Sequence, residues 1–342
     1  AGKPHLVTNH NTGELEVFVQ DAKNNIYLIN KAGKILWKVK IDGPIMGDVH
    51  QMDLYKNNKL QYIFNTKQKV HLIDRNGNNV EQFPFSLAAK AANGLFLMDD
   101  GKKNYQYFVA CENYKVYGYT SNGKPLQGWN PKPRVGTIPF AAQYTEHEGK
   151  DYLILTNIDG TLLFYNTGGD RHERPIRLDA DFEQPFYIHE HHKTFTLVNA
   201  SKGRMLFTIN AKGEVKETTA ESLPPYYYFT GAEIDTALQY VFVAPDKVSF
   251  TSPELIVTNT FTPKQPLDLP GQLFSLGESG QLLGLSSAAG NEVYLIDMLG
   301  QLLPGMPLKG STAMEVGHLF SKDELTLIVG DADGNLNAYR LP

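Results

Sequence analysis

The sequence predicts an all-β fold, an eight-bladed β-propeller built from four-stranded antiparallel blades. A strand–turn–strand motif, NEVYLIDMLGQLLPGMP in Asn291–Pro307, returns along the whole chain, with copies that begin at Asn25, Lys69, Lys115 and Arg204. The apolar residue near the start of each copy recurs at intervals of 42 to 46 residues. Polar and apolar residues alternate within each repeat, and no long segment has the 3.6-residue period of a helix.

The blade count follows from eight strand starts. They lie at Ile26, Val70, Val116, Leu162, Leu206, Val248, Val293 and Leu336. A period of about 40–50 residues in an all-β chain is typical of propeller blades. Residues 1–342 are therefore expected to form one domain, with blades that begin near residues 4, 45, 93, 138, 184, 226, 271 and 312.

Every repeat has the same internal order of strands. In the second repeat the expected strands are Gly47–Tyr55, Leu60–Lys67, Lys69–Asn76 and Asn79–Leu87. In the fourth repeat they are Pro139–His147, Asp151–Asp159, Thr161–Gly168 and Glu173–Leu178. Only Phe85–Ala92 is compatible with a helix, and it is too short for more than a turn or two.

The two ends of the chain are expected to differ. The last repeat has strands at Glu315–Phe320, Leu325–Gly330 and Leu336–Arg340 and then ends, so its blade is expected to have three strands. Pro4–Thr8 turns directly into Glu14–Val19, which makes it the innermost strand of the first blade. A bare outer edge invites association with another strand. The chain is therefore expected to be a fragment, or the mature end, of a longer protein.

Composition argues against several classes of function. A net charge of −5 and a pI near 6.1 do not suit a surface for nucleic acid or anionic lipid, which needs clustered Lys and Arg. No apolar run approaches the ~20 residues of a membrane helix. Cys111 is the only cysteine, which excludes a disulfide framework and a cysteine-built metal site. No nucleic-acid partner and no membrane insertion are expected.

Two stretches carry a family resemblance. IYLINKAGKILW (Ile26–Trp37) and DGNLNAYR (Asp333–Arg340) resemble the DGxLYALDxxTGKxLW signature of pyrroloquinoline-quinone-type repeat propellers. The endings LLPGMP and PLQGW are similar to the blade-closing turn of extracellular and periplasmic repeat propellers. That group includes quinoprotein dehydrogenases, kinase-associated sensor domains and non-enzymatic outer-membrane assembly scaffolds. The resemblance implies the propeller fold and a periplasmic, cell-envelope or extracellular location.

The features of the catalytic members are missing. Those members have an adjacent cysteine pair, a calcium ion held by Glu, Asn and Asp, and a catalytic Asp, whereas this chain has a single cysteine. Their tryptophan docking pattern remains only as Trp37 and Trp129. The chain is therefore placed in a non-catalytic branch, with no cofactor and no catalytic residues expected.

Two short strings are compatible with a metal ion. His189 and His191 alternate and would suit zinc or copper, but the equivalent place in other repeats is a polar hairpin tip. Asp331, Asp333 and Asn335 imitate the start of a calcium loop, but further oxygen ligands are missing and Asp-Gly is a strong hairpin signal. Both strings are interpreted as turns, with a metal site as the alternative.

Candidate ligand-binding residues come from two patterns. The first strands of several blades carry polar or aromatic side chains at Asp48, His50, Gln143, Tyr187 and Glu315. Phe140 and the run Tyr226, Tyr227 and Tyr228 lie at the entry to blades. Tyrosine suits sugar stacking and protein interfaces, because it offers a rigid apolar area with a polar tip. Packing of the tyrosine run between blades is the other interpretation.

The binding surface is expected on the side that carries the connections between successive blades. These connections are longer and richer in proline and aromatic residues than the opposite hairpin tips, and they include Asp42–Asp48, Pro131–Phe140, Arg177–Phe186 and Glu221–Phe229. The short Lys, Gly and Asn turns of the opposite side have little to bind with.

These observations predict a non-enzymatic protein-interaction or scaffold propeller of an exported or cell-envelope protein. Its partner would be another protein or an upstream domain of the same chain. The alternative is a propeller that binds, or cleaves, a small ligand or glycan in a central funnel.

Overall fold

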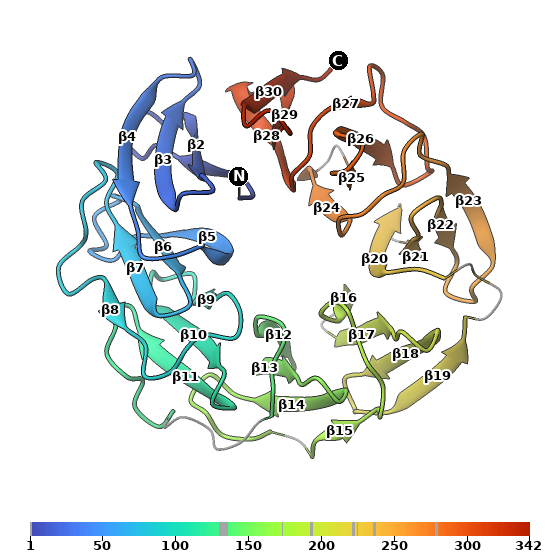
Figure 1. Ribbon diagram of the computed structural model, residues 1–342. Coiled ribbons are helices and arrows are strands. Elements are labelled where there is room, and N and C mark those ends of the chain that lie inside the picture. Colours follow the sequence, from blue (N-terminus) through green and yellow to red (C-terminus); the bar gives the residue numbers. More distant parts are fainter. Residues whose placement is uncertain are drawn as a thin grey trace. The chain divides into compact units, whose positions relative to one another are not determined.

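The computed structural model describes residues 2–129, 136–172, 174–191, 194–220, 223, 225–234, 237–277 and 280–342. The chain is an all-β, eight-bladed propeller, and its last blade has three strands, as predicted (Figure 1). Its contacts divide it into two compact units. The N-terminal unit is essentially Val7–Asp181, and the C-terminal unit is essentially Phe182–His191 and Phe195–Pro342 with the first residues up to Leu6. The single-domain organisation stays a prediction.

The first four sheets are antiparallel, with their strands in chain order. The first contains β1 (His5–Thr8), β2 (Leu15–Gln20), β3 (Asn25–Asn30) and β4 (Ile35–Lys40). The second contains β5 (Met46–Met52), β6 (Gln61–Asn65), β7 (Lys69–Ile73) and β8 (Phe85–Ser86). The third has, among the described residues, β9 (Phe96–Asp99), β10 (Tyr105–Cys111) and β11 (Lys115–Thr120). The fourth contains β12 (Gln143–His147), β13 (Lys150–Thr156), β14 (Thr161–Tyr165) and β15 (Ile176–Arg177).

The last four sheets repeat this order. The fifth contains β16 (Tyr187–His191), β17 (Thr194–Ala200), β18 (Met205–Asn210) and β19 (Val215–Thr219). The sixth contains β20 (Tyr228–Ile234), β21 (Ala237–Val243), β22 (Val248–Thr251) and β23 (Val257–Phe261). The seventh contains β24 (Gln272–Ser275), β25 (Gln281–Ser287), β26 (Glu292–Asp297) and β27 (Leu308–Lys309). The eighth contains β28 (Met314–Ser321), β29 (Glu324–Gly330) and β30 (Leu336–Arg340).

The positions predicted for the repeated strands agree with the structure. Each of the eight predicted strand starts is the first or second residue of the third strand of a blade. No helix in the described part of the chain has the length and apolarity that a membrane crossing requires.

The stretch Phe85–Ala92, which is compatible with a helix in sequence, contains the short strand β8 and no helix, and β8 lies within the expected strand Asn79–Leu87. Its backbone N–H groups are used elsewhere: Leu87 N and Ala91 N donate to the carbonyls of Gln68 and Lys67, both at 2.8 Å. Backbone N–H groups committed to a neighbouring turn are not available for i→i−4 bonds. In the fourth blade, Glu173 of the predicted last strand lies outside the described residues.

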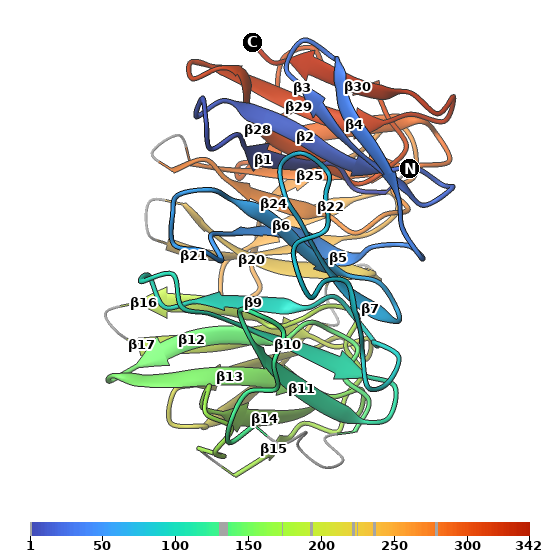
Figure 2. The same cartoon turned by 90° about the vertical axis from the view of Figure 1, so that its left-hand side faces the viewer.

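The core lies between successive sheets. In the N-terminal unit, Phe108 and Val116 of the third sheet pack against Leu153 and Leu163 of the fourth, and Figure 2 shows these sheets one beside the other. Trp129 closes this layer with 2% of its surface exposed. Burial of large aromatic side chains contributes about 3–5 kcal/mol each, judged by their truncation to alanine.

Glycine is required beneath the two tryptophans. A Cβ atom on Gly118 would lie 2.9 Å from the ring of Trp129, and one on Gly77 would lie 3.0 Å from the ring of Trp37. Both indole N–H groups donate to backbone carbonyls, Trp129 to Val116 at 3.0 Å and Trp37 to Arg75 at 2.8 Å. The two tryptophans therefore hold neighbouring elements of the propeller together.

Amide side chains at the end of the second strand hold the connections between blades in place. Asn65 donates from Nδ2 to the carbonyl of Asn93 at 3.1 Å and accepts the N–H of Leu95 at 2.7 Å. In the fifth blade, Asn199 donates to the carbonyl of Gln184 at 2.8 Å and accepts its Nε2–H at 2.9 Å. Gln20 likewise bonds Gly43 and Ile45. These three side chains are called the strand-end amides below.

Candidate functional site

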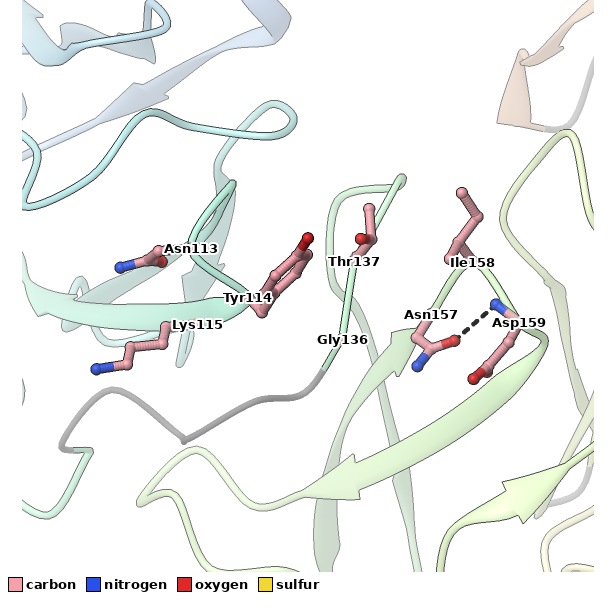
Figure 3. A pocket seen from close by; sticks show the side chains of 8 residues that line it. All are labelled: Asn113, Tyr114, Lys115, Gly136, Thr137, Asn157, Ile158 and Asp159. Carbon is pink, nitrogen blue, oxygen red and sulfur yellow. Dashed lines mark hydrogen bonds between the residues drawn. The ribbon is translucent and has the colours of Figure 1, made fainter.

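A wide groove opens on the N-terminal unit at the end of the strands where the blade connections run. It has a volume of about 960 Å³. Three segments line it: Asn113–Lys115 of the β10–β11 turn, Gly136 and Thr137 of the connection before β12, and Asn157–Asp159 of the β13–β14 turn (Figure 3). The N–H of Ile158 donates to the carbonyl of Thr137 at 2.9 Å, which ties the connection to the turn. This is the side on which the sequence predicts binding.

Two large apolar side chains face this groove from adjacent blades. Tyr114 is 51% exposed and Ile158 is 59% exposed. Figure 3 shows them on opposite sides of Thr137, with Tyr114 from the β10–β11 turn and Ile158 from the β13–β14 turn. Each would gain by leaving water, since burial of a large apolar side chain is worth about 1.5–3 kcal/mol. The groove thus offers two apolar contacts to an incoming molecule.

Tyr114 has a backbone conformation that tyrosine rarely adopts. Its φ is 63°, and its N–H closes the turn on the carbonyl of Cys111 at 3.0 Å. The same turn position has positive φ in five other blades, where it is held by Asn24, Gly160, Arg204, Asn291 and Gly334. Asn and Gly tolerate left-handed backbone, whereas a bulky residue there costs roughly 1–2 kcal/mol. Such strain tends to be retained at functional sites.

Charged groups border the groove. Lys115 lies on the side of Tyr114 and Asp159 on the side of Ile158 (Figure 3). Asp159 lines the groove as a carboxylate at neutral pH, and a hydrogen bond from the Thr161 side chain lowers its pKa further. A second hollow of about 540 Å³ shares Asp159 and continues to Arg171 and Arg177. The two apolar side chains therefore lie between charges of both signs.

The C-terminal unit has a smaller groove in the equivalent place. Its volume is about 250 Å³, and Gln184, Lys202, Tyr226 and Tyr227 are among the residues that line it. The Tyr226 hydroxyl donates to the carbonyl of Ser201 at 3.1 Å, and the Tyr227 hydroxyl donates to a second backbone carbonyl, that of Leu269, at 3.0 Å. Burial raises the pKa of Tyr226 to about 12.

The structure shows the packing interpretation of the tyrosine run, and its contribution to a binding face stays a prediction. Tyr226 packs against Phe242 with ring centroids 4.9 Å apart, and Tyr227 and Tyr228 pack against the next hydrophobic cluster. Tyr226 and Tyr227 also border the small groove. Of the connection before it, Glu221, Ser222 and Pro224 lie outside the described residues.

A hydrogen-bonded cluster joins two innermost strands of the C-terminal unit. His189 Nδ1 lies 2.9 Å from Glu233 Oε1, and the Tyr187 hydroxyl lies 3.5 Å from the same oxygen. Burial, with the charge of Glu233, raises the pKa of Tyr187 to about 12. Glu233 has no counterpart among the predicted site residues. In the sequence, Glu233 could have been noticed as the one charged residue of the stretch Tyr228–Ile234.

The interpretation of the histidine string as a turn is wrong for its first part. His189 and His191 belong to β16, because the strand continues through them, and His192 lies outside the described residues. Their rings are 5.9 Å apart. Among the described residues, no three His, Cys, Asp or Glu side chains are grouped as metal ligands.

The turn interpretation is confirmed for the second string. Asp331 Oδ1 accepts the N–H groups of Asp333 at 3.0 Å and Asn335 at 2.9 Å, which closes the β29–β30 turn. Lys309 Nζ lies 3.4 Å from Asp331 Oδ2. The carboxylate is thus occupied by the turn and by a lysine.

The other predicted site residues are spread over three blades and one connection. Asp48 and His50 are on β5, Gln143 begins β12 and Glu315 is on β28. Phe140 is in a connection, where its carbonyl accepts Asn93 Nδ2–H at 2.6 Å. None of these five lines the three hollows described above. The residues that do line the wide groove, Tyr114 and Ile158, were not predicted.

Comparison with known proteins supports the fold alone. No family model and no curated protein matches the sequence. Among solved structures, BamB from Moraxella catarrhalis is similar with a TM-score of 0.64 and 12% identity, covering 98% of this chain and 96% of BamB. Dihydro-heme d1 dehydrogenase NirN, in complex with DHE, is similar with a TM-score of 0.67 and 13% identity, covering 100% of this chain and 75% of NirN. BBS1N in complex with ARL6DN is similar with a TM-score of 0.60 and 14% identity, covering 88% of this chain and 93% of BBS1N. At such identity the likeness shows a shared propeller fold and no more.

Proposed function

We propose that this propeller is a non-enzymatic protein-interaction module that binds a partner protein through the wide groove of its N-terminal unit. The observation that carries the proposal is the pair Tyr114 and Ile158, two large apolar side chains more than half exposed on one groove. Single exposed apolar residues are ordinary on a protein surface. A pair over one hollow, bordered by charges of both signs, is typical of a docking surface.

The conformation of Tyr114 also supports binding. A left-handed turn in this position favours Asn or Gly for stability, so stability alone does not explain a tyrosine there. Tyrosine is enriched among the residues that contribute most to protein interfaces. BBS1N, a neighbour of the same fold, was crystallised in complex with ARL6DN, so a chain of this fold forms a complex with another protein.

The proposal includes a compartment. The resemblance to extracellular and periplasmic repeat propellers supports an exported or cell-envelope protein whose partner is a second protein or an upstream domain of the same chain. Fractionation of cells that express the native gene tests this part, and recovery in the cytoplasmic fraction alone would contradict it.

A site-specific crosslinking experiment tests the groove. A photoreactive phenylalanine analogue placed at Tyr114 or Ile158 is expected to capture one protein in the native host. The same analogue at Val215, an exposed residue of β19 in the C-terminal unit, serves as the control. Equal capture at all three positions, or capture at none, would overturn the proposal.

Point variants then quantify the interaction with the captured partner after both proteins are purified. Tyr114→Asn with Ile158→Asn is expected to weaken binding at least 30-fold, because a buried aromatic anchor typically contributes 2 kcal/mol or more. Tyr55→Ala removes an exposed tyrosine at the other end of the strands and is expected to leave the affinity unchanged. An unchanged affinity of the double variant would refute the groove as the binding site.

A further inference from the structure

A third hollow of the N-terminal unit lies at the opposite end of the strands, where the sequence predicts little to bind with. Its volume is about 520 Å³. The β1–β2 turn, the β5–β6 turn and the segment between β7 and β8 form it, through residues such as His10, Tyr55, Lys59, Arg75 and Asn76. The short turns of this side therefore combine into a cleft, although no single one of them is large.

The rear of this cleft is held rigidly. The Arg75 guanidinium pairs with the carboxylate of Glu16, which is 3% exposed and also accepts Asn9 Nδ2–H at 3.0 Å. Trp37 Nε1 donates to the backbone carbonyl of Arg75 at 2.8 Å. Side chains fixed by such second contacts lose little conformational entropy when a ligand binds.

The imidazole of His10 is also held in one orientation. Its Nδ1 accepts the N–H of Leu60 at 3.1 Å. Burial, together with the positive charges of Arg75 and Lys59, lowers the pKa of His10, so the ring is neutral at pH 7. In the neutral ring the proton is then on Nε2, which makes this atom a hydrogen-bond donor.

Arg75, which lines the cleft, and its buried partner Glu16 each have one polar atom without a partner in the described part of the chain. Arg75 Nε and Glu16 Oε2 are buried and have no hydrogen-bond partner among the described residues. Buried polar atoms of this kind are normally satisfied by water or by a ligand. Asn76 and Asn79 also line the cleft, and their side-chain amides each offer donors and an acceptor.

An exposed aromatic ring completes the lining. Tyr55 is 56% exposed, whereas most tyrosines of this chain are buried or half-buried. The β5–β6 turn that carries it is fixed by Asp53, which is 1% exposed and accepts the N–H groups of Asn57 at 3.0 Å and Asn58 at 2.7 Å. The ring is thus presented from a well-anchored turn.

We propose that this cleft binds a carbohydrate of two to three sugar units. A sugar ring offers alternating hydroxyl donors and acceptors at its edge and an apolar face of C–H groups. The amides, the neutral His10 and Arg75 match the edge, and the Tyr55 ring matches the face. Lys59 and Arg75 are balanced by Asp74 and Glu81, so the cleft has no excess charge that would select a phosphate. Its volume falls in the range of small-ligand sites.

The test uses the full chain and a panel of defined trisaccharides, built from glucose, galactose, mannose, N-acetylglucosamine or galacturonate. Saturation-transfer NMR and the fluorescence of Trp37, which lies behind Arg75, report binding at up to about 10 mM sugar. At least one sugar is expected to bind with a Kd of about 0.1–1 mM. Failure of every sugar in the panel would overturn the proposal.

Variants locate the site. Tyr55→Ala is expected to weaken the affinity for the sugar at least tenfold, and Asn76→Ala about threefold. The melting temperatures are expected to stay unchanged, because both side chains lie at the surface of turns. Tyr114→Asn, at the other end of the strands, serves as the matched control and is expected to bind the sugar like the unsubstituted chain. If Tyr55→Ala and Asn76→Ala also bind normally, the sugar lies elsewhere and the assignment is wrong. Neither result bears on the capture of a protein at Tyr114.

Discussion

The grooves of the two units are built from the same parts of a blade, yet one has a volume of about 960 Å³ and the other of about 250 Å³. Tyr114 and Arg204 occupy the same left-handed turn position in the third and fifth blades. Tyr114 is exposed over its groove, whereas Arg204 donates from Nη2 to the carbonyl of Leu223 at 2.8 Å. In the C-terminal unit, Tyr226 and Tyr227 also bond backbone carbonyls with their hydroxyls.

This difference separates aromatic residues that maintain the fold from those available to a partner. Tyrosines of the first kind have a hydroxyl bonded to backbone and a partly buried ring, and their loss is expected to lower stability. Tyr114 has neither feature, and its loss is expected to lower binding. Each prediction below tests one side of this contrast, beginning with what the two units share.

The largest expected effect concerns the strand-end amides, which serve both units alike. Asn65→Ala and Asn199→Ala are each expected to lower the free energy of unfolding by about 3 kcal/mol, because each removes at least two buried hydrogen bonds and leaves their partners unsatisfied. Urea denaturation measures the change. A loss below 1 kcal/mol in only one unit would show that the connections of that unit are held in another way.

Removal of tyrosine hydroxyls should distinguish the two grooves. The double variant Tyr226→Phe, Tyr227→Phe is expected to lose about 2 kcal/mol of stability, since each hydroxyl bonds a backbone carbonyl. Tyr114→Phe is the matched control and is expected to change stability by less than about 0.5 kcal/mol. Equal losses at both grooves would remove the distinction drawn between them.

A reciprocal exchange tests the strained turn. Tyr114→Asn is expected to raise the free energy of unfolding by about 1 kcal/mol, or the melting temperature by about 2 °C, because Asn accepts a φ of 63° more readily. Asn24→Tyr, at the same turn position with a φ of 60°, is expected to lose a similar amount. Calorimetry of both variants decides the matter, and a loss of stability in Tyr114→Asn would mean that the tyrosine supports the fold.

The smallest effect is a dependence on pH that belongs to the N-terminal unit. Burial lowers the pKa of His71 although the ring bonds Asp42 at 2.7 Å, and the pKa of His10 is lowered as well. The unfolded chain takes up these protons near pH 6.5 and the folded chain does not, so stability falls as the pH drops below about 6.5. His71→Gln is expected to reduce this loss between pH 7 and pH 5 by up to about 1 kcal/mol.

Hydrogen exchange locates the pH effect. Amides of β6 and β7 are expected to lose protection on acidification before those of β21 and β22, which lie in the C-terminal unit. A uniform loss over both units would argue against these histidines as the cause.

The order of strands was predictable because it depends on a local pattern repeated eight times. The alternation of polar and apolar residues predicts the start of the third strand to within one residue in every blade, from Ile26 to Leu336. The extent of the last strand in a blade was not predictable, since β8 and β15 contain only two residues and their lengths depend on contacts with neighbouring turns. Phe85–Ala92 is compatible with a short helix in sequence, but its backbone bonds the turn before β7 instead.

The wide groove was harder to predict than the tyrosine run, although its signal is present in the repeat. Aligned turns contain Asn24, Gly160, Asn291 and Gly334 in four blades, and bulky residues in two, Arg204 and Tyr114. Arg204 bonds the carbonyl of Leu223, whereas the Tyr114 side chain is exposed, which marks Tyr114 as the candidate for binding. Whether it faces a hollow depends on Ile158 and on the connection before β12, which the sequence of one turn does not contain.

The strand-end amides also bear on how readily such a binding face is re-engineered. Asn65 and Gln20 recognise peptide N–H and C=O groups of the connections, and these groups are the same whatever side chains the connection carries. A connection grafted from another protein, or randomised in a library, would therefore find its anchor points already in place if its length is kept. The connections between blades are thus expected to be exchangeable without redesign of the strands.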